Sequence, residues 1–178
     1  MDAVTFIRHS LNQVHQRLTE TCRGLTYEQV SWRPAPHANN IGFILWHVAR
    51  AEDRTVGALL SSRGELWVTR HWHLQFGNSV ESPPPGDKMG LLSMPIPTPD
   101  ILMGYLNDVH RSTIRFLESL TLEDLDAAPS DDQPQRTVAA LLRHQITHKN
   151  NHHGQVDYIR GLQDPDWDLP PGTGVVQE

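Results

Sequence analysis

The sequence predicts an all-α fold: a four-helix bundle with a long loop rich in proline and glycine between its second and third helices. Four long segments carry apolar residues at steps of three and four, and no segment alternates as a strand would. Residues 64–97 include "SPPPGDKMGLLSMPIP", which argues against regular structure there. A chain of 178 residues can bury one proper core. We therefore expect residues 1–178 to form one domain.

The first helix is expected at about residues 2–23, where the apolar residues form one stripe. The stripe consists of Val4, Ile7, Leu11, Val14 and Leu18. Gly24 would end this helix. Thr26 and Gln29 have the spacing of a capping box, which predicts a short helical turn after it.

The second long helix is expected at about residues 41–62, with Asn40 as its N-cap and Gly64 as its stop. The third is expected at about residues 99–119, because Thr98 and Pro99 form a helix start. The fourth is expected at about residues 137–162, beginning near Thr137. Together with the first helix, these segments complete the predicted bundle.

Composition excludes several classes of protein. The net charge of −6 argues against nucleic acid as a partner, since phosphate binding requires clustered basic residues. No apolar stretch is long enough to span a bilayer, and "MDAVTFIRHS" lacks the apolar core of a signal peptide. The single cysteine, Cys22, cannot form an internal disulfide, which favours a cytoplasmic protein. We interpret Cys22 as a packed helix residue rather than a nucleophile.

Four of the eleven histidines fall in "RHQITHKNNHHGQ", residues 143–155. On the expected fourth helix, the buried stripe would consist of Val138, Leu141, Val156 and Ile159. A rotation of about 100° per residue then places His148 and His152 within that stripe, one turn apart. The same rotation places His144 at the edge of the stripe, as a supporting or surface residue, and His153 on the opposite side, facing solvent.

His47 lies on the flank of the second helix and would face the bundle interior. Two histidines spaced i, i+4 share one helix face, and a third from another helix could complete a three-histidine site for a divalent metal. Such a site leaves coordination positions open for water or substrate. The pair alone could equally be a coincidence on a solvent-facing surface. His47 strengthens the metal interpretation because unpartnered buried imidazoles are costly.

Residues near His47 carry weaker signals. Glu52 and Asp53 are expected to point away from the interior as a solvated pair. Arg54, two turns after His47, could bind a substrate carboxylate, although an ion pair is the more ordinary role. Trp46 is interpreted as packing. Within the 64–97 loop, His71 and His73 could overhang the site or contact a metal, and Trp67 and Trp72 could hold a bulky substrate.

"IGFILWHVARAEDR" and "HKNNHHGQVDYIRGL" together resemble the DinB-like superfamily, and the likeness covers nearly the whole chain. The resemblance implies an up-down-down-up four-helix bundle, often a homodimer, with a divalent metal on His47, His148 and His152. Zn²⁺ fits this implied ligand set best, and Ni²⁺, Fe²⁺ or Mn²⁺ is compatible with it. Asn151 and His153 replace an aromatic residue and an arginine that are common in the family's motif.

The resemblance also implies a function. Characterised members include transferases and isomerases that use the thiols bacillithiol or mycothiol, so we expect a metal-dependent thiol S-transferase or isomerase acting on a small molecule, with a low-molecular-weight thiol as cosubstrate. Two alternatives remain open. One is a metal-dependent hydrolase. The other is a non-enzymatic binding or stress-response module whose metal is closed by a fourth ligand from the 64–97 loop.

Overall fold

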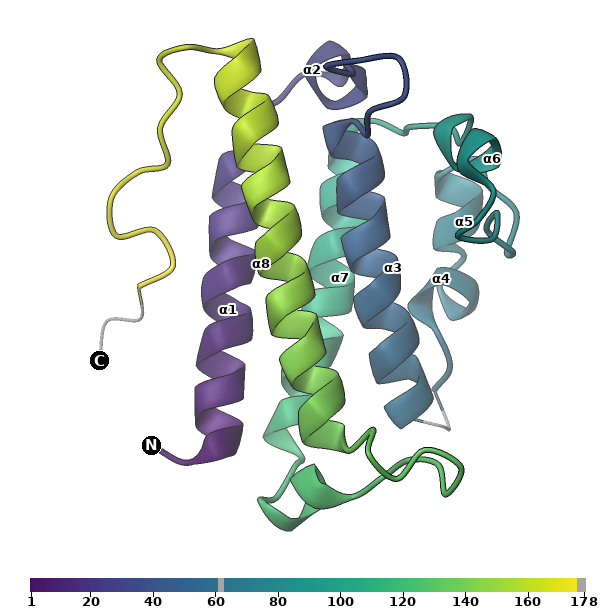
Figure 1. Cartoon of the computed structure of the whole chain (residues 1–178), viewed down its shortest axis with the longest axis vertical. Helices are drawn as coiled ribbons and strands as arrows, with labels where there is room; N and C mark the ends of the chain where they lie inside the picture. The colour runs from purple at the N-terminus through teal and green to yellow at the C-terminus, as the bar shows by residue number, and fades with distance from the viewer. Residues whose placement is uncertain (61–62, 176–178) are drawn as a thin grey trace.

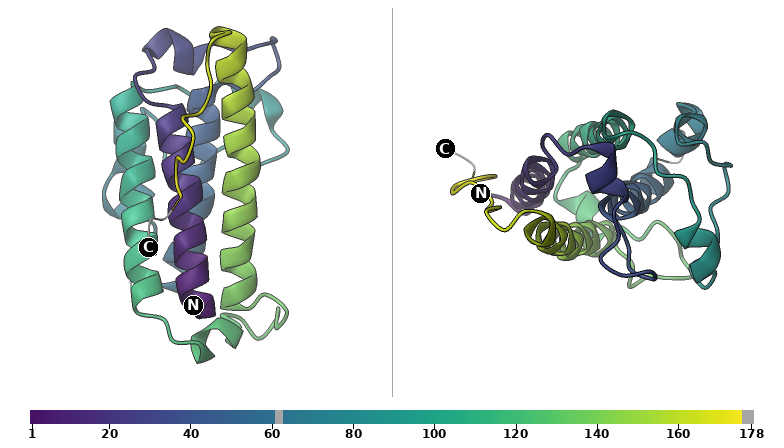
Figure 2. Two further views of the ribbon diagram at one scale, coloured as in Figure 1. Left: turned by 90° about the vertical axis from the view of Figure 1, so that its left-hand side faces the viewer. Right: turned by 90° about the horizontal axis from the view of Figure 1, so that it is seen from above.

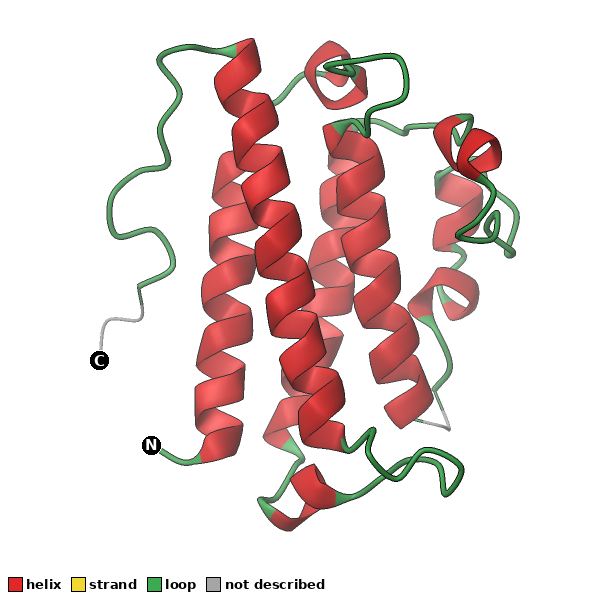
Figure 3. Cartoon of the chain, in the orientation of Figure 1, coloured by secondary structure: helices red, strands yellow, loops and turns green. Residues whose placement is uncertain are grey.

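A computed structural model describes residues 1–60 and 63–175. Throughout these residues the secondary structure is helical and contains no strand (Figure 3), as the sequence predicts. Four long helices pack as a bundle (Figure 1). They are α1 (Ala3–Thr21), α3 (Ile41–Leu59), α7 (Pro99–Glu118) and α8 (Val138–Gln163).

The course of the chain agrees with the up-down-down-up order. In Figure 1, α1 and α8 run upward, whereas α3 and α7 run downward. Seen from above (Figure 2), each long helix has two long neighbours: α1 lies beside α7 and α8, and α3 lies beside the same two helices. The contact between α3 and α8 matters most for function, because these helices carry the three histidines singled out above.

Most of these helices begin at the N-cap residues that the sequence predicts. The side chains of Asn40 and Thr137 accept hydrogen bonds from the first turns of α3 and α8. Thr26 and Gln29 form the predicted capping box of α2 (Tyr27–Ser31). Thr98 occupies the N-cap position of α7 but makes no side-chain hydrogen bond there. A short 3-10 helix, η1 (Glu123–Asp126), precedes α8.

The prediction that residues 64–97 lack regular structure is wrong in part, because three short helices form there. These are α4 (Leu66–Thr69), α5 (Trp72–Gln75) and α6 (Lys88–Leu92). The first two form because Leu66, Trp67 and Phe76 are buried against the bundle. The predicted end of the second helix near residue 62 falls outside the described residues, and α3 itself ends at Leu59.

Apolar residues form two clusters, one above and one below the middle of the bundle. Between them, each long helix contributes buried polar side chains that we call the polar layer. Its members are His15, Glu52, His110 and Lys149. Lys149 and Glu52 form an ion pair with both side chains 1% exposed.

The expectation that Glu52 and Asp53 are solvated is therefore wrong. Glu52 faces α8 inside the bundle, where it meets Lys149. Asp53 faces α4, where its carboxylate accepts hydrogen bonds from the backbone N–H groups of Leu66 and Trp67 and from the Tyr105 hydroxyl. The two carboxylates are buried because α3 is covered both by the bundle and by the short helices. In the part of the chain that the structure describes, no helix is long and apolar enough to cross a membrane.

Candidate metal centre

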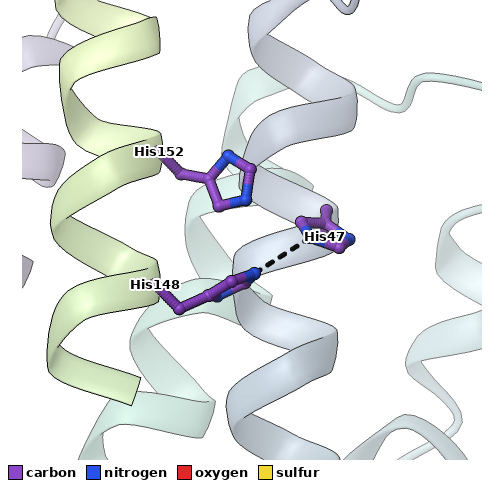
Figure 4. A group of neighbouring side chains, drawn as sticks. All are labelled: His47, His148 and His152. Carbon is purple, nitrogen blue, oxygen red and sulfur yellow. Dashed lines mark hydrogen bonds between the residues drawn. The ribbon is translucent and has the colours of Figure 1, made fainter. Parts of the chain in front are cut away.

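His47 from α3 and His148 and His152 from α8 converge between these two helices (Figure 4). One ring nitrogen from each lies within 4.8 Å of the others. Nε2 of His47 and Nε2 of His148 are 3.0 Å apart. All three side chains are half-buried, so the cluster is held by the fold and remains open on one side. The predicted convergence of the three histidines is thus observed.

The predicted rotation of α8 is off by about one residue. The buried side of the helix carries Gln145, Lys149 and His153, and Leu141 from the predicted stripe is only half-buried. His148 and His152 consequently lie at the edge of the bundle rather than inside its core. The error arose because buried polar residues were read as outward-facing.

His153 was expected to face solvent, and that expectation is wrong. Its side chain is 3% exposed, and its Nε2 lies 3.0 Å from the Thr21 hydroxyl on α1. His144 is exposed, as expected for a residue at the edge of the site, and its ring centroid is 5.6 Å from that of His148.

The electrostatics of the cluster favour neutral imidazoles. Burial, followed by the nearby His152 and Arg54, lowers the pKa of His47 to about 4. Burial and the neighbouring histidines likewise lower the pKa of His148 to about 4. Near pH 7 both rings are therefore uncharged and present lone pairs, which is the form that binds a metal ion.

Gln155 orients the third histidine. Its Oε1 lies 2.8 Å from Nδ1 of His152, one turn away on α8. An amide oxygen only accepts hydrogen bonds, so Nδ1 of His152 donates and its Nε2 keeps a free lone pair. Such outer contacts commonly fix the ring of a metal-binding histidine. The i, i+3 spacing on the predicted helix was the signal that could have identified this role from the sequence.

A pocket of about 860 Å³ opens beside the cluster and is lined by His47 and His152. Its walls come from α3, from the α2–α3 connection and from the segment around α6. The remaining lining residues are His37, Asn39, Phe43, Trp46, Arg54, Ser82, Pro83, Pro85, Lys88, Met89, Leu91 and Leu92. None of the described lining residues is acidic. Pro83 and Pro85 from the 64–97 loop line the pocket, and nothing in the sequence pattern indicated Lys88 or Met89.

The aromatic and histidine residues of the first half of the loop lie elsewhere. Trp67 is fully buried, and the indole N–H of Trp72 donates to Asp108. Nδ1 of His73 lies 2.9 Å from the Trp67 carbonyl oxygen. Neither His71 nor His73 joins the candidate metal ligands, which among the described residues are the three histidines alone. The expectation that these loop residues hold a metal or a substrate is not met.

Three further residues can now be placed. Trp46 is buried and packs against Phe43 and Trp67, as its packing interpretation requires. Cys22 is buried, and burial raises the pKa of its thiol to about 12, which leaves it protonated and unreactive. Arg54 is exposed at the pocket wall and makes no ion pair with any residue in the described ranges, contrary to its expected role.

Comparisons with known proteins agree with this arrangement. The family model of the DinB superfamily matches residues 10–156. A crystal structure of a conserved protein from Enterococcus faecalis is similar, with a TM-score of 0.79 and 23% sequence identity. The match covers 91% of this chain and 97% of that chain. At this identity the likeness supports the fold alone. No curated protein matches the chain.

Proposed function

Because the chain belongs to the DinB superfamily, we propose that His47, His148 and His152 hold a divalent metal ion and that the protein is a metal-dependent thiol S-transferase. The observation that carries the proposal is the convergence of three histidine side chains at the side of a large pocket. The substrate would be a small molecule, and a low-molecular-weight thiol would be the cosubstrate.

The residues fit a metal ion. Three nitrogen donors from two helices leave coordination positions open, as catalytic zinc sites do. Gln155 already holds His152 with its Nε2 free. Zn²⁺ suits nitrogen ligands and an additional sulfur ligand, so it is the ion we propose. When bound, such an ion lowers the pKa of a coordinated thiol, whose ordinary value is about 8.5, toward or below neutrality.

The pocket walls supply the rest of the site. Phe43, Met89 and Leu92 offer apolar surface on which the carbon skeleton of an electrophile can pack out of water. In the proposed reaction the thiol sulfur attacks an electrophilic carbon. The new C–S bond forms, the bond to the leaving group breaks, and the thiol proton passes to solvent.

The lining favours a thiol over water as the nucleophile. Metal-assisted hydrolysis often uses a carboxylate base within hydrogen-bond reach of the water. Glu52 and Asp53 are buried in contacts away from the pocket, and no acidic residue occurs among its described lining residues. A thiol requires no such base, because its pKa is already close to neutral.

The test combines the zinc-loaded protein with monochlorobimane and, in turn, bacillithiol, mycothiol or glutathione. We expect thiol–bimane product to form faster than in the uncatalysed reaction, and we expect removal of the metal to abolish the acceleration. Native mass spectrometry of the purified protein would report metal stoichiometry and whether the proposed homodimer forms.

Two matched histidine variants test whether metal binding and activity depend on the three proposed ligands rather than on a neighbouring histidine. His47→Ala should lose both metal and activity. His144→Ala should keep both, because His144 is exposed and lies one turn before His148. Hydrolysis of amide or ester substrates, without acceleration by any thiol, would replace the transferase with a hydrolase.

A further inference from the structure

The charge of the pocket lining opposes the charge of the whole protein. The chain has 21 acidic and 15 basic residues, and its net charge is −6. Among the lining residues that the structure describes, Arg54 and Lys88 are basic and none is acidic. A cleft lined by one sign of charge attracts ligands of the opposite sign. The lining therefore favours a negatively charged occupant.

Arg54 differs from Arg50, one turn earlier on the same helix. Arg50 is buried, pairs with Glu65 at 2.7 Å and lies 4.8 Å from the ring centroid of Trp67. Arg54 is exposed at the pocket wall, and within the described ranges no carboxylate pairs with it. Arg50 thus holds the fold together, whereas the Arg54 guanidinium is free to bind a ligand.

Arg54 also lines a second cavity, of about 270 Å³. Its lining includes Arg136 and Ser130, which add another guanidinium and a hydroxyl group. No acidic residue is among its described lining residues. Arg54 therefore lines two cavities whose described lining residues include other basic side chains and no acidic one. This environment suits an anionic group with several acceptor oxygens.

The distance between Arg54 and the histidines limits the length of the ligand. Arg54 follows His47 by seven residues on α3, which is about 10 Å along the helix axis. Both residues line the same pocket. One molecule can therefore place a reactive atom beside His47 and an anionic group beside Arg54, with a spacer about the size of a benzene ring between them.

We propose that Arg54 is a specificity-determining residue that binds a carboxylate of the substrate, so that the site selects anionic small molecules over their neutral counterparts. This inference rests on the proposed function, because it assigns the substrate class of the same site. The carboxylate could belong to the electrophile or to the thiol. A planar guanidinium binds a carboxylate through two parallel hydrogen bonds, which a neutral amide cannot reproduce.

The kinetic test uses matched substrates. The electrophiles are 4-chloro-3-nitrobenzoate and 4-chloro-3-nitrobenzamide, and each is paired with 3-mercaptopropionate or with 3-mercaptopropionamide. In each reaction a C–S bond replaces the C–Cl bond, chloride leaves, and the thiol proton passes to buffer. The four combinations show which partner carries the recognised carboxylate.

We expect Arg54→Gln to lower kcat/KM for the anionic partner about tenfold or more, mainly through KM, because a charge-assisted bidentate contact is lost. For the neutral partner, kcat/KM should change less than about twofold. Arg115→Gln is the control, because Arg115 is exposed on α7 and lines neither cavity. The metal content of both variants should equal that of the unmodified protein.

A binding measurement separates this inference from the proposed reaction. Calorimetry compares the unreactive ligands 4-nitrobenzoate and 4-nitrobenzamide on the zinc-loaded protein. Tighter binding of the anion, lost in Arg54→Gln and kept in Arg115→Gln, supports the role of Arg54 even if no thiol is turned over. The inference is overturned if the unmodified protein binds both ligands equally or not at all, or if Arg54→Gln retains the preference for the anion.

Discussion

Replacing Lys149 with methionine should destabilise the protein strongly, because the change leaves a buried carboxylate without its main partner. Lys149 and Glu52 are each 1% exposed and are joined across α8 and α3. Burial by itself raises the pKa of Glu52, but Lys149 and His110, through their charges and hydrogen bonds, together outweigh burial and hold that pKa well below its usual range. Methionine has nearly the length of lysine and fills its space, so the lost charge is the main perturbation.

The magnitude follows from the burial of the pair. Removing one partner of a fully buried ion pair typically costs about 3–5 kcal/mol. With a urea m-value of about 2 kcal/mol/M for a chain of this size, the midpoint of unfolding should fall by roughly 2 M. The Nδ1 atom of His110 lies 3.8 Å from Glu52 and can take up a proton in place of the lost ammonium. The loss should consequently be smaller at pH 5 than at pH 8.

The assay is urea unfolding followed by far-UV circular dichroism for Lys149→Met, Glu52→Met and the double variant. Each single variant should lose stability, and the double variant should lose less than the sum of the two, because no unpaired charge remains. A midpoint shift below about 0.5 M for Lys149→Met, or simple additivity in the double variant, would show that the pair is not coupled as the structure implies.

Three further predictions concern individual histidines and their partners. His153→Ala should lower the free energy of unfolding by about 1–3 kcal/mol in urea titrations, because it removes a buried side chain together with its hydrogen bond to the Thr21 hydroxyl, yet metal content measured by mass spectrometry should not change. Gln155→Ala should weaken metal binding about tenfold or more in a chelator competition, because His152 loses the acceptor that orients its ring. Burial lowers the pKa of His15 to about 2, so from about pH 6.5 downward the unfolded chain binds a proton that the folded one does not. Stability should decrease as the pH decreases over that window, and His15→Gln should show a shallower decrease in thermal unfolding; an unchanged slope would contradict the assignment.

The fold and the histidine cluster could be predicted from the sequence because local signals determine them. Asn40, Thr26 and Thr137 cap helices where the pattern placed those caps. His47 and an i, i+4 pair on another helix indicated that three histidines could converge, and the resemblance to the DinB-like superfamily implied the same three residues as metal ligands. Such features depend on a few neighbouring residues and on helical periodicity, which the sequence displays directly.

The polar layer and the short helices could not be predicted in the same way. Glu52 and His153 are polar, so a search for apolar stripes placed them at the surface, and it gave no sign that Lys149 is buried. Their burial is compensated by partners on other helices, which lie far away in the sequence. The first short helix of residues 64–97, α4, likewise depends on the Asp53 carboxylate of α3, which accepts hydrogen bonds from the N–H groups of Leu66 and Trp67.

The one-residue error on α8 shows what the polar layer does for the site. His148 and Lys149 are adjacent, so their side chains point about 100° apart, one toward the pocket and the other into the bundle. A rotation of α8 by one residue that turned His148 inward would also turn Lys149 to where the exposed Asn150 now points, breaking its ion pair with Glu52. Apolar packing tolerates exchange of similar side chains, whereas separating a buried charge from its partner strongly destabilises the fold. The Glu52–Lys149 pair, together with the hydrogen bond from Gln145 to Thr55, therefore fixes the rotation of α8 against α3, which is what brings His148 and His152 to face His47.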